Sequence, residues 1–242
     1  MKFKFILVCF FITLGLNSCY IGNKTIKGEG DIVTETLQLS SIEGIALLGA
    51  DEVIVQQGST QEIKAVGHAN IIHKLQKNVK NGVWNIALEN GSYSNYSLTI
   101  YITVPSIKEV ELMGSGNIKV GAFTGQKNIS AKLIGSGDID LSELSGTEKL
   151  TLLLTGSGDI NCKTNRSDIN NLSAELTGSG DINCSGINSK NAIVKLVGSG
   201  DCTVNVESSL ESYISGSGDI RYKGNPSITK KISGSGEVVQ EK

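Results

Sequence analysis

The chain has 242 residues and carries 22 basic and 24 acidic side chains, so its net charge is only −2. Without a basic excess it lacks the patch that would neutralise phosphates, which argues against a nucleic-acid partner. Its 29 glycines, 2 prolines and 5% aromatic residues are typical of short strands separated by tight turns. We therefore expect an all-β protein.

The N-terminus has the pattern of an export signal. Two lysines precede an apolar run over residues 5–16, which is too short to span a bilayer as a permanent helix. The run ends at Cys19 in the sequence Leu-Asn-Ser-Cys, which resembles a bacterial lipobox. We predict a signal peptide over 1–18, a lipid anchor on Cys19 and a tether over 19–30. The alternative is ordinary cleavage that leaves Cys19 as a free thiol.

Residues 31–105 contain strand-like runs with irregular spacing. Residues 70–77 could form a short helix, and Asn81-Gly82 and Asn90-Gly91 have the composition of hairpin turns. We interpret this part as the start of the regular region that follows, together with its cap, because an open end would template aggregation. The strand-like runs are 32–39, 52–57, 62–66, 84–88 and 98–104.

From residue 106 onward the chain repeats Gly-Ser-Gly followed by a polar or acidic residue. In the aligned copies, apolar residues recur two, four and six positions before the first glycine and again after the motif. One unit cannot enclose a core, but stacked units bury these columns continuously. We predict that 106–242 is a parallel β-solenoid with coils of about 20 residues, in one domain with 31–105. The copies begin at Gly114, Gly135, Gly156, Gly178, Gly198, Gly216 and Gly234, and a related Gly-Glu-Gly-Asp stands at 28–31.

The lipobox, the irregular strands after it and the chain of Gly-Ser-Gly-Asp motifs together resemble a known family. This is the bacterial "putative auto-transporter adhesin, head GIN domain" family, which is frequent in Bacteroidetes, and the resemblance covers roughly residues 30–235. It implies a right-handed β-helix and an adhesive role. Because function does not follow from fold alone, the resemblance supports the architecture more than the activity.

An acidic column follows the repeated motif. If the coils stack, adjacent carboxylates would repel each other by about 1 kcal/mol in water. Either each carboxylate accepts main-chain N–H bonds at its own corner, or the column binds Ca²⁺ through carboxylate and carbonyl oxygens. Both alternatives stay open, and no other cofactor is expected. The column contains Asp138, Asp159, Asp181, Asp201 and Asp219.

Cys162 and Cys184 fall in the same inward column of adjacent coils, where an oxidising envelope would permit a disulfide. Buried free thiols are the alternative, because Cβ atoms stacked at ~4.8 Å are slightly too far apart for a bridge. Cys202 falls in the neighbouring inward column. His68 and His73 have no acidic or cysteine partner that would complete a zinc set, so we interpret them as ordinary histidines.

The sequence favours a non-enzymatic role at the cell envelope. The acids belong to the repeat, whereas polysaccharide-cleaving β-helix enzymes carry irregular carboxylate clusters. We predict a rigid, lipid-anchored adhesin that binds glycans or proteins at the cell surface. The alternatives are an envelope scaffold with protein partners only, including self-association, and a polysaccharide-active enzyme. Tyr20 stands where inner-membrane retention would need Asp, which favours the outer membrane.

Overall fold

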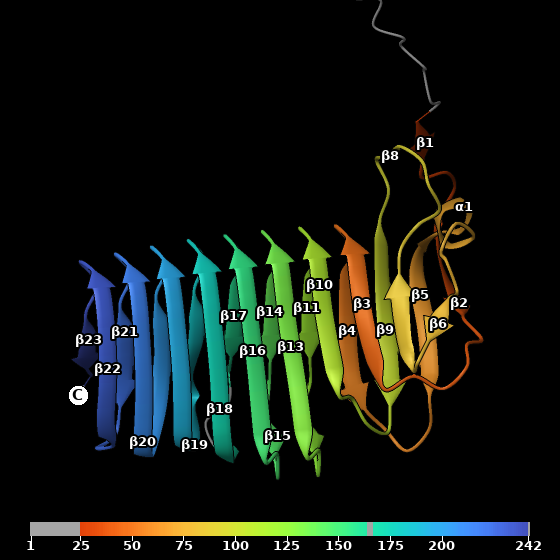
Figure 1. The fold of residues 1–242 in the computed structure, drawn as a ribbon. Coiled ribbons are helices and arrows are strands. Elements are labelled where there is room, and N and C mark those ends of the chain that lie inside the picture. The colour runs from red at the N-terminus through yellow and green to blue at the C-terminus, as the bar shows by residue number, and fades with distance from the viewer. Residues whose placement is uncertain (1–24, 164–166, 242) are drawn as a thin grey trace, which may run out of the picture.

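The computed structural model describes residues 25–163 and 167–241. The predicted signal peptide, Cys19 and the first part of the tether lie outside the described residues. Strands make up 65% of the structure, and α1 (Ala69–Ile72) is the one helix among the described residues. The chain winds into a parallel β-solenoid with coils of about 21 residues, which confirms the predicted fold class (Figure 1).

Each regular coil supplies one strand to a front sheet and one to a back sheet. In Figure 1 the front strands point up and the coils advance toward the C-terminus on the left, so the winding is right-handed. The front sheet contains β3 (Gly44–Gly49), β10 (Glu109–Gly114), β13 (Asn128–Gly135), β16 (Lys149–Gly156), β18 (Ser167–Gly178), β22 (Ser227–Gly234) and the C-terminal parts of β19 (Ile182–Gly198) and β20 (Cys202–Gly216).

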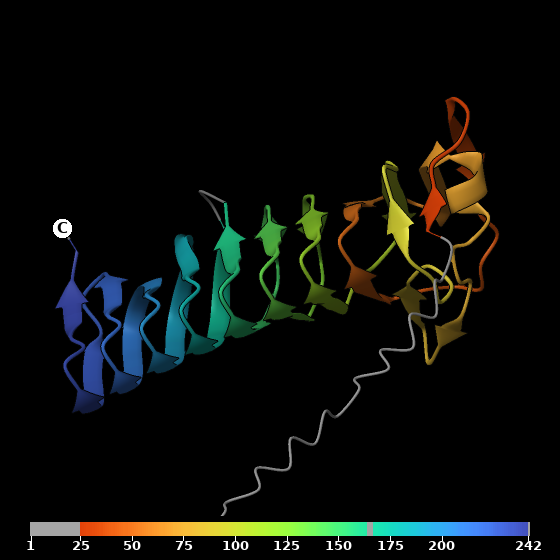
Figure 2. The same cartoon turned by 90° about the horizontal axis from the view of Figure 1, so that it is seen from above.

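The back sheet is built from the strand that follows each corner. Its strands are shorter, and a third, narrower side is formed where β12 (Phe123–Thr124) pairs with β15 (Leu144–Ser145). The coils follow one another along a single axis (Figure 2). The back sheet contains β4 (Glu52–Gln57), β11 (Asn117–Val120), β14 (Asp138–Leu141), β17 (Asp159–Cys162), β21 (Ile220–Lys223), β23 (Val238–Gln240) and the first parts of β19 and β20.

The front strands pair in parallel through their corner glycines. Gly49 lies opposite Gly114, Gly114 lies opposite Gly135, and the pairing continues to Gly234. A shift of one residue would turn every apolar side chain outward, so the burial pattern sets this register. The β19–β20 pairing slips between Cys184 and Asn191, where the coil shortens while the corner glycines stay aligned.

The predicted inward columns form the core. The column two residues before the corner glycine is at most 3% exposed from Leu112 to Ile214, whereas Ile232 in the last coil is 39% exposed. Ser212 and Lys230 occupy the next inward column, and the buried Ser212 hydroxyl has no hydrogen-bond partner among the described residues. β22 is exposed along its whole length. The core therefore weakens toward the last coil.

The first coil consists of β3 and β4, although its corner lacks the repeated motif. Gly49-Ala50-Asp51-Glu52 takes the place of Gly-Ser-Gly-Asn, because β3 pairs with β10 and β4 pairs with β11. Residues 58–108 separate this coil from the next one along the chain. The residues of β4 predicted a strand, whereas those of β3 did not, because β3 carries only a short apolar run.

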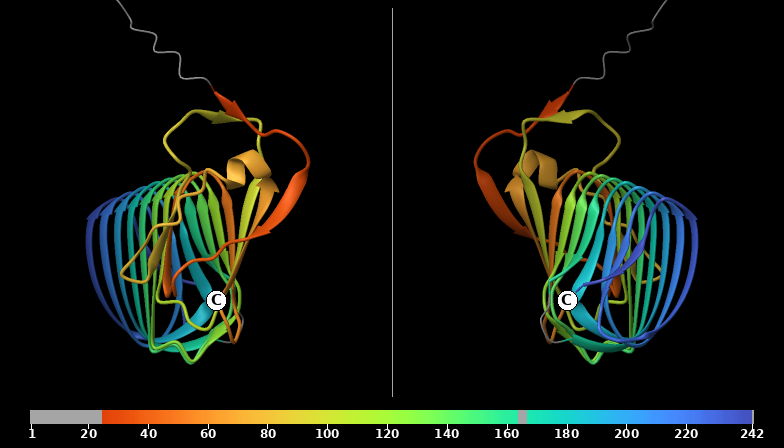
Figure 3. Two further views of the ribbon diagram at one scale, coloured as in Figure 1. Left: turned by 90° about the vertical axis from the view of Figure 1, so that its right-hand side faces the viewer. Right: turned by 90° about the vertical axis from the view of Figure 1, so that its left-hand side faces the viewer.

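The inserted segment covers the N-terminal end of the solenoid (Figure 3). On the back sheet, β9 (Leu98–Val104) pairs in parallel with β4, and β5 (Glu62–His68) and β2 (Ile32–Thr36) continue in antiparallel order. On the front sheet, β7 (Val83–Ile86) lies beside β3 and forms a hairpin with β6 (Val79–Lys80). A separate pair joins β1 (Ile26–Lys27) to β8 (Tyr93–Ser94).

Three local predictions for this segment have different outcomes. Asn81 and Gly82 form the expected hairpin turn, with φ of 54° and 77°. Asn90-Gly91 does not, because the strand after it, β8, pairs in parallel with β1. The helix spans only residues 69–72, and the motif at 28–31 is not a solenoid corner, since it precedes β2 and pairs with no coil.

Candidate functional site

The repeated corner is built around close contact between successive backbones. The first glycine of each copy has φ between 128° and 144°, a conformation that L side chains rarely adopt. A Cβ at Gly135 would lie 2.0 Å from the carbonyl oxygen of Gly114, and one at Gly137 would lie 1.9 Å from that of Gly116. Both glycines are therefore needed for the coils to stack, and the motif is a structural part.

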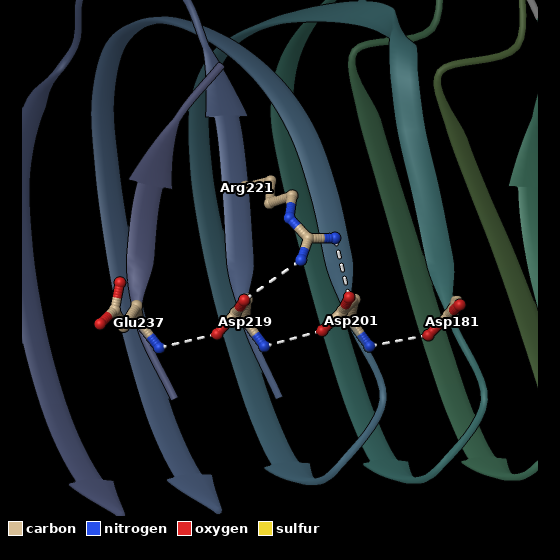
Figure 4. Close-up of polar contacts among 5 residues, drawn as sticks. All are labelled: Asp181, Asp201, Asp219, Arg221 and Glu237. Carbon is tan, nitrogen blue, oxygen red and sulfur yellow. Dashed lines mark hydrogen bonds and ion pairs between the residues drawn. The ribbon is translucent and has the colours of Figure 1, made fainter. Parts of the chain in front are cut away.

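The aspartates after the corner form a hydrogen-bonded ladder between coils (Figure 4). One of the two alternatives was that each carboxylate bonds to N–H groups at its own corner, but each one accepts from the main-chain N–H of the next acid in the column. Asp181 Oδ1 accepts from Asp201 N at 2.7 Å, and Asp201 Oδ1 accepts from Asp219 N at 2.9 Å. The same bond joins Asp138 to Asp159 (3.2 Å), Asp159 to Asp181 (2.9 Å) and Asp219 to Glu237 (3.0 Å).

Cationic side chains offset part of the charge in this column. Arg221 donates to Asp201 Oδ2 at 2.8 Å and to Asp219 Oδ2 at 3.1 Å, so one guanidinium bridges two coils. Asp201 and Asp219 raise the pKa of Arg221. Lys163 lies 2.8 Å from Asp140, which faces outward two residues after the ladder position. The ladder therefore has two sources of compensation, N–H bonds along its length and cations beside it.

Metal binding stays a prediction for this column. Within residues 25–163 and 167–241, no three His, Cys, Asp or Glu side chains converge on one point as a metal site would require. Each ladder carboxylate already uses one oxygen for an N–H bond. The two histidines contact different partners. His73 pairs with Glu35 at 3.1 Å, and His68 Nδ1 accepts a hydrogen bond from Ser97 N at 3.3 Å.

The structure brings two of the cysteines into contact. The Sγ atoms of Cys162 and Cys184 lie 2.9 Å apart in the core. Cys202 is also buried, but it lies opposite Ile182, in the neighbouring inward column. Burial and the adjacent Cys162 raise the pKa of the Cys184 thiol.

The outer side of the front sheet carries an open groove that the sequence analysis did not identify. We call it the front groove. It consists of two depressions of about 650 and 510 Å³ that share Lys149 and follow the beginnings of successive front strands. Lys127 and Lys149 are exposed and form no ion pair with another described residue. The polar lining includes one acid, Glu211, together with Lys108, Lys127, Asn128, Ser130, Lys149, Asn171, Ser173, Asn191 and Ser209.

Elsewhere on the front sheet, charged residues pair across coils. Lys132 lies 2.7 Å from Glu111, and Lys195 lies 3.9 Å from Glu175. These ion pairs are exposed or half-exposed, so each stabilises the fold by at most about 1 kcal/mol. Lys127 and Lys149 differ from them because their charges are available to a ligand.

The cap holds a third depression, and a half-buried acid lies at the first corner. The depression, of about 820 Å³, lies between residues 36–41 and 58–63 and has a polar lining of hydroxyl and amide groups. At the first corner, burial raises the pKa of Asp51, and Tyr96 donates a hydrogen bond to it. Burial and Asp51 raise the pKa of Tyr96 to about 12. Neither feature has a motif in the sequence.

Among the described residues, no helix is long and apolar enough to cross a membrane. No functionally curated protein matches the chain. The chain shares its fold with the crystal structure of a putative lipid binding protein from Parabacteroides distasonis, with 24% sequence identity and a TM-score of 0.73 over 90% of this chain and 100% of the other. It also shares the fold of a putative adhesin from Bacteroides fragilis, with 21% identity and a TM-score of 0.80 over 89% of this chain and 100% of the other. A putative adhesin from Parabacteroides merdae has 20% identity and a TM-score of 0.70 over 90% of this chain and 99% of the other.

The sequence profile of one family matches residues 41–226, which is most of the chain and includes the first coil. The match spans six of the seven repeated glycine corners, the aspartates from Asp138 to Asp219 and the front groove described above. The resemblance noted from the lipobox and the repeated motif is thereby confirmed. The chain belongs to the family described as putative auto-transporter adhesin, head GIN domain.

Proposed function

We propose that this protein is a non-enzymatic adhesin of the cell envelope that binds surface glycans or proteins along its front groove. The observation that carries the proposal is the unbroken register of the front sheet from Gly49 to Gly234, which repeats equivalent outward positions about every 4.8 Å. Repeated weak contacts on one rigid face give avidity to a linear or multivalent ligand. The family name and the adhesin names of two structural relatives agree with this role.

The groove chemistry indicates which ligands fit. Asn128, Lys149, Asn171, Asn191 and Ser209 stand opposite one another in successive strands, so amide, hydroxyl and ammonium groups follow the solenoid axis. Amides and hydroxyls both donate and accept hydrogen bonds, as sugar hydroxyls require. The free charges of Lys127 and Lys149 favour a ligand that carries carboxylate or sulfate groups.

The proposed anchor is a lipidated Cys19 in the outer membrane. It is supported by the lipobox and by the position of β1, which places the start of the described chain at the capped end (Figure 1). A membrane attached there would leave the coils and the front groove projecting away from it. Radiolabelled fatty-acid incorporation, lost in Cys19→Ala, and membrane fractionation test the anchor separately from binding.

Binding is tested with the double variant Lys127→Glu/Lys149→Glu and with Lys80→Glu as its control. Lys80 is also exposed but lies in the cap, outside the groove. Loss of one charge-assisted contact costs about 1.5–3 kcal/mol, so the double variant should bind an acidic glycan or a target cell at least about tenfold more weakly. The control should bind normally. A protein that retains no glycan, matrix protein or cell on an array contradicts the adhesin proposal.

Scaffolding is the second candidate, and it is favoured by the exposed last coil. β22 is exposed along its length, and Ile228, Ile232 and Val239 are 38–39% exposed. In-cell crosslinking distinguishes the two roles, because a scaffold should capture only itself or envelope proteins. An enzymatic role would require Asp159→Asn to abolish turnover of a polysaccharide, whereas the ladder bond of Asp159 predicts an effect on stability alone.

A further inference from the structure

Cys162 and Cys184 occupy a position in the core that fits a covalent cross-link between two coils. Cys162 ends β17 and Cys184 follows the Ile182–Asn183 segment of β19 that pairs with it. Adjacent parallel strands place their Cα atoms ~4.8 Å apart, within the 4.4–6.8 Å that disulfides span. The sequence left the bridge and free thiols as alternatives, because stacked Cβ atoms are slightly too distant for a disulfide. The side chains remove that objection, because both sulfurs turn toward each other to 2.9 Å.

The third buried cysteine provides an internal comparison. Cys202 lies opposite Ile182, so it continues the column two residues nearer the corner than Cys184. Val204 instead lies opposite Cys184. The pair is therefore flanked along its own column by Leu141 and Val204, and Cys202 is flanked by isoleucines. Position in the register, rather than mere proximity in sequence, selects which two sulfurs meet.

We propose that Cys162 and Cys184 form a disulfide that cross-links adjacent coils, and that it forms while the coils are closing, before the core is sealed. The proposal rests on the proposed export to an oxidising envelope. The oxidant is a disulfide, either of a thiol–disulfide oxidoreductase or of glutathione. The Cys162 thiolate attacks it and expels one thiol, and the Cys184 thiolate then attacks the mixed disulfide and expels the second. The two protons leave with the two expelled thiols.

The timing follows from burial. Cys162 is 5% exposed and Cys184 is 0% exposed, so a disulfide reagent cannot reach either sulfur in the closed core. Burial also disfavours the thiolate of Cys184, which is the reactive form. Once formed, the bond is equally shielded from reductants. The disulfide would therefore form only in protein that folds in an oxidising compartment, and it would persist afterward.

The decisive experiment refolds the full chain. Protein reduced in urea is diluted into a mixture of reduced and oxidised glutathione, alkylated during unfolding, and digested without reduction for mass spectrometry. We expect a linked peptide that contains Cys162 and Cys184, with the alkyl group on Cys202. The variant Cys202→Val should keep this peptide, and Cys162→Val should lose it without creating a Cys184–Cys202 link. Alkylation of both Cys162 and Cys184, or a link from either of them to another of the five cysteines of the chain, overturns the proposal.

Two further measurements test the timing and the consequence. Folded, reduced protein should acquire the link at least about tenfold more slowly than refolding protein, and equal rates contradict the timing. The oxidised protein should unfold at higher urea than the reduced one, and Cys162→Val should remove the difference. Expression with the native signal tests export separately, because an uncleaved precursor contradicts the proposed localisation while the refolding result still decides the cross-link.

Discussion

Two substitutions at Asp181 distinguish a hydrogen-bonding role of the aspartate ladder from an electrostatic or metal-binding role. Asp181 is in the middle of the column, where its Oδ1 accepts from Asp201 N and its own N–H donates to Asp159. Asp181→Asn keeps an acceptor oxygen and removes the charge. Asp181→Ala removes both. The difference between the two variants isolates the hydrogen bond, since each relieves the same repulsion.

Two opposing effects determine the size of the change. Carboxylates one coil apart at ~4.8 Å repel each other by about 0.9 kcal/mol in water. Neutralising Asp181 removes its repulsion with the carboxylate on either side, Asp159 and Asp201. Screening at physiological salt reduces the sum of these two repulsions to about 1 kcal/mol. A hydrogen bond to a charged acceptor contributes about 1.5 kcal/mol at an exposed site. We expect Asp181→Asn to be neutral or slightly stabilising and Asp181→Ala to be about 1 kcal/mol less stable than Asp181→Asn.

Urea unfolding of the two variants and the parent at low and high salt measures these terms. The advantage of Asp181→Asn over the parent should shrink at high salt, while the gap between the two variants should remain. Equal stability of the two variants would refute the ladder. Melting curves with calcium and with a chelator extend the test: the ladder predicts no calcium dependence. A calcium-stabilised parent whose gain disappears equally in both variants would favour a cation site.

Three further predictions concern the corner, the core and the cap. Gly135→Ala should lower the free energy of unfolding in urea by more than about 2 kcal/mol, because its Cβ would meet a carbonyl oxygen at 2.0 Å. The control Gly125→Ala has open space around it and should cost about 1 kcal/mol. Leu154→Ala should cost about 2–5 kcal/mol by the same assay, and a loss below 1 would contradict a sealed core. The free energy of unfolding should fall between pH 10 and 12, because the unfolded chain loses the Tyr96 proton first. Ultraviolet titration should show a tyrosine with a midpoint near 12, and Tyr96→Phe should remove this titration and make the loss of stability shallower.

Sequence and structure differ most at the first coil. The inward columns were predictable from two features of the repeat. Side chains alternate with a period of two along each strand, and the repeated corner aligns the strands, so only one arrangement buries every apolar residue. Gly49-Ala50-Asp51-Glu52 was not recognised, because β3 pairs with β10 across a long insertion and only backbone pairing reveals the alignment. The strands of the cap were largely predicted, but their antiparallel order depends on contacts that local patterns do not encode.

For the candidate sites, the sequence by itself determined which residues share a column, since the position relative to the corner glycine decides whether a side chain faces in or out. The aspartate column and the cysteine pair were both found in this way. Only the tertiary structure decided what those residues do to one another. The carboxylates bond to the next coil, the two sulfurs turn to 2.9 Å, and Lys127 and Lys149 line one groove. These outcomes depend on side-chain direction and on stacking between coils, which no single repeat contains.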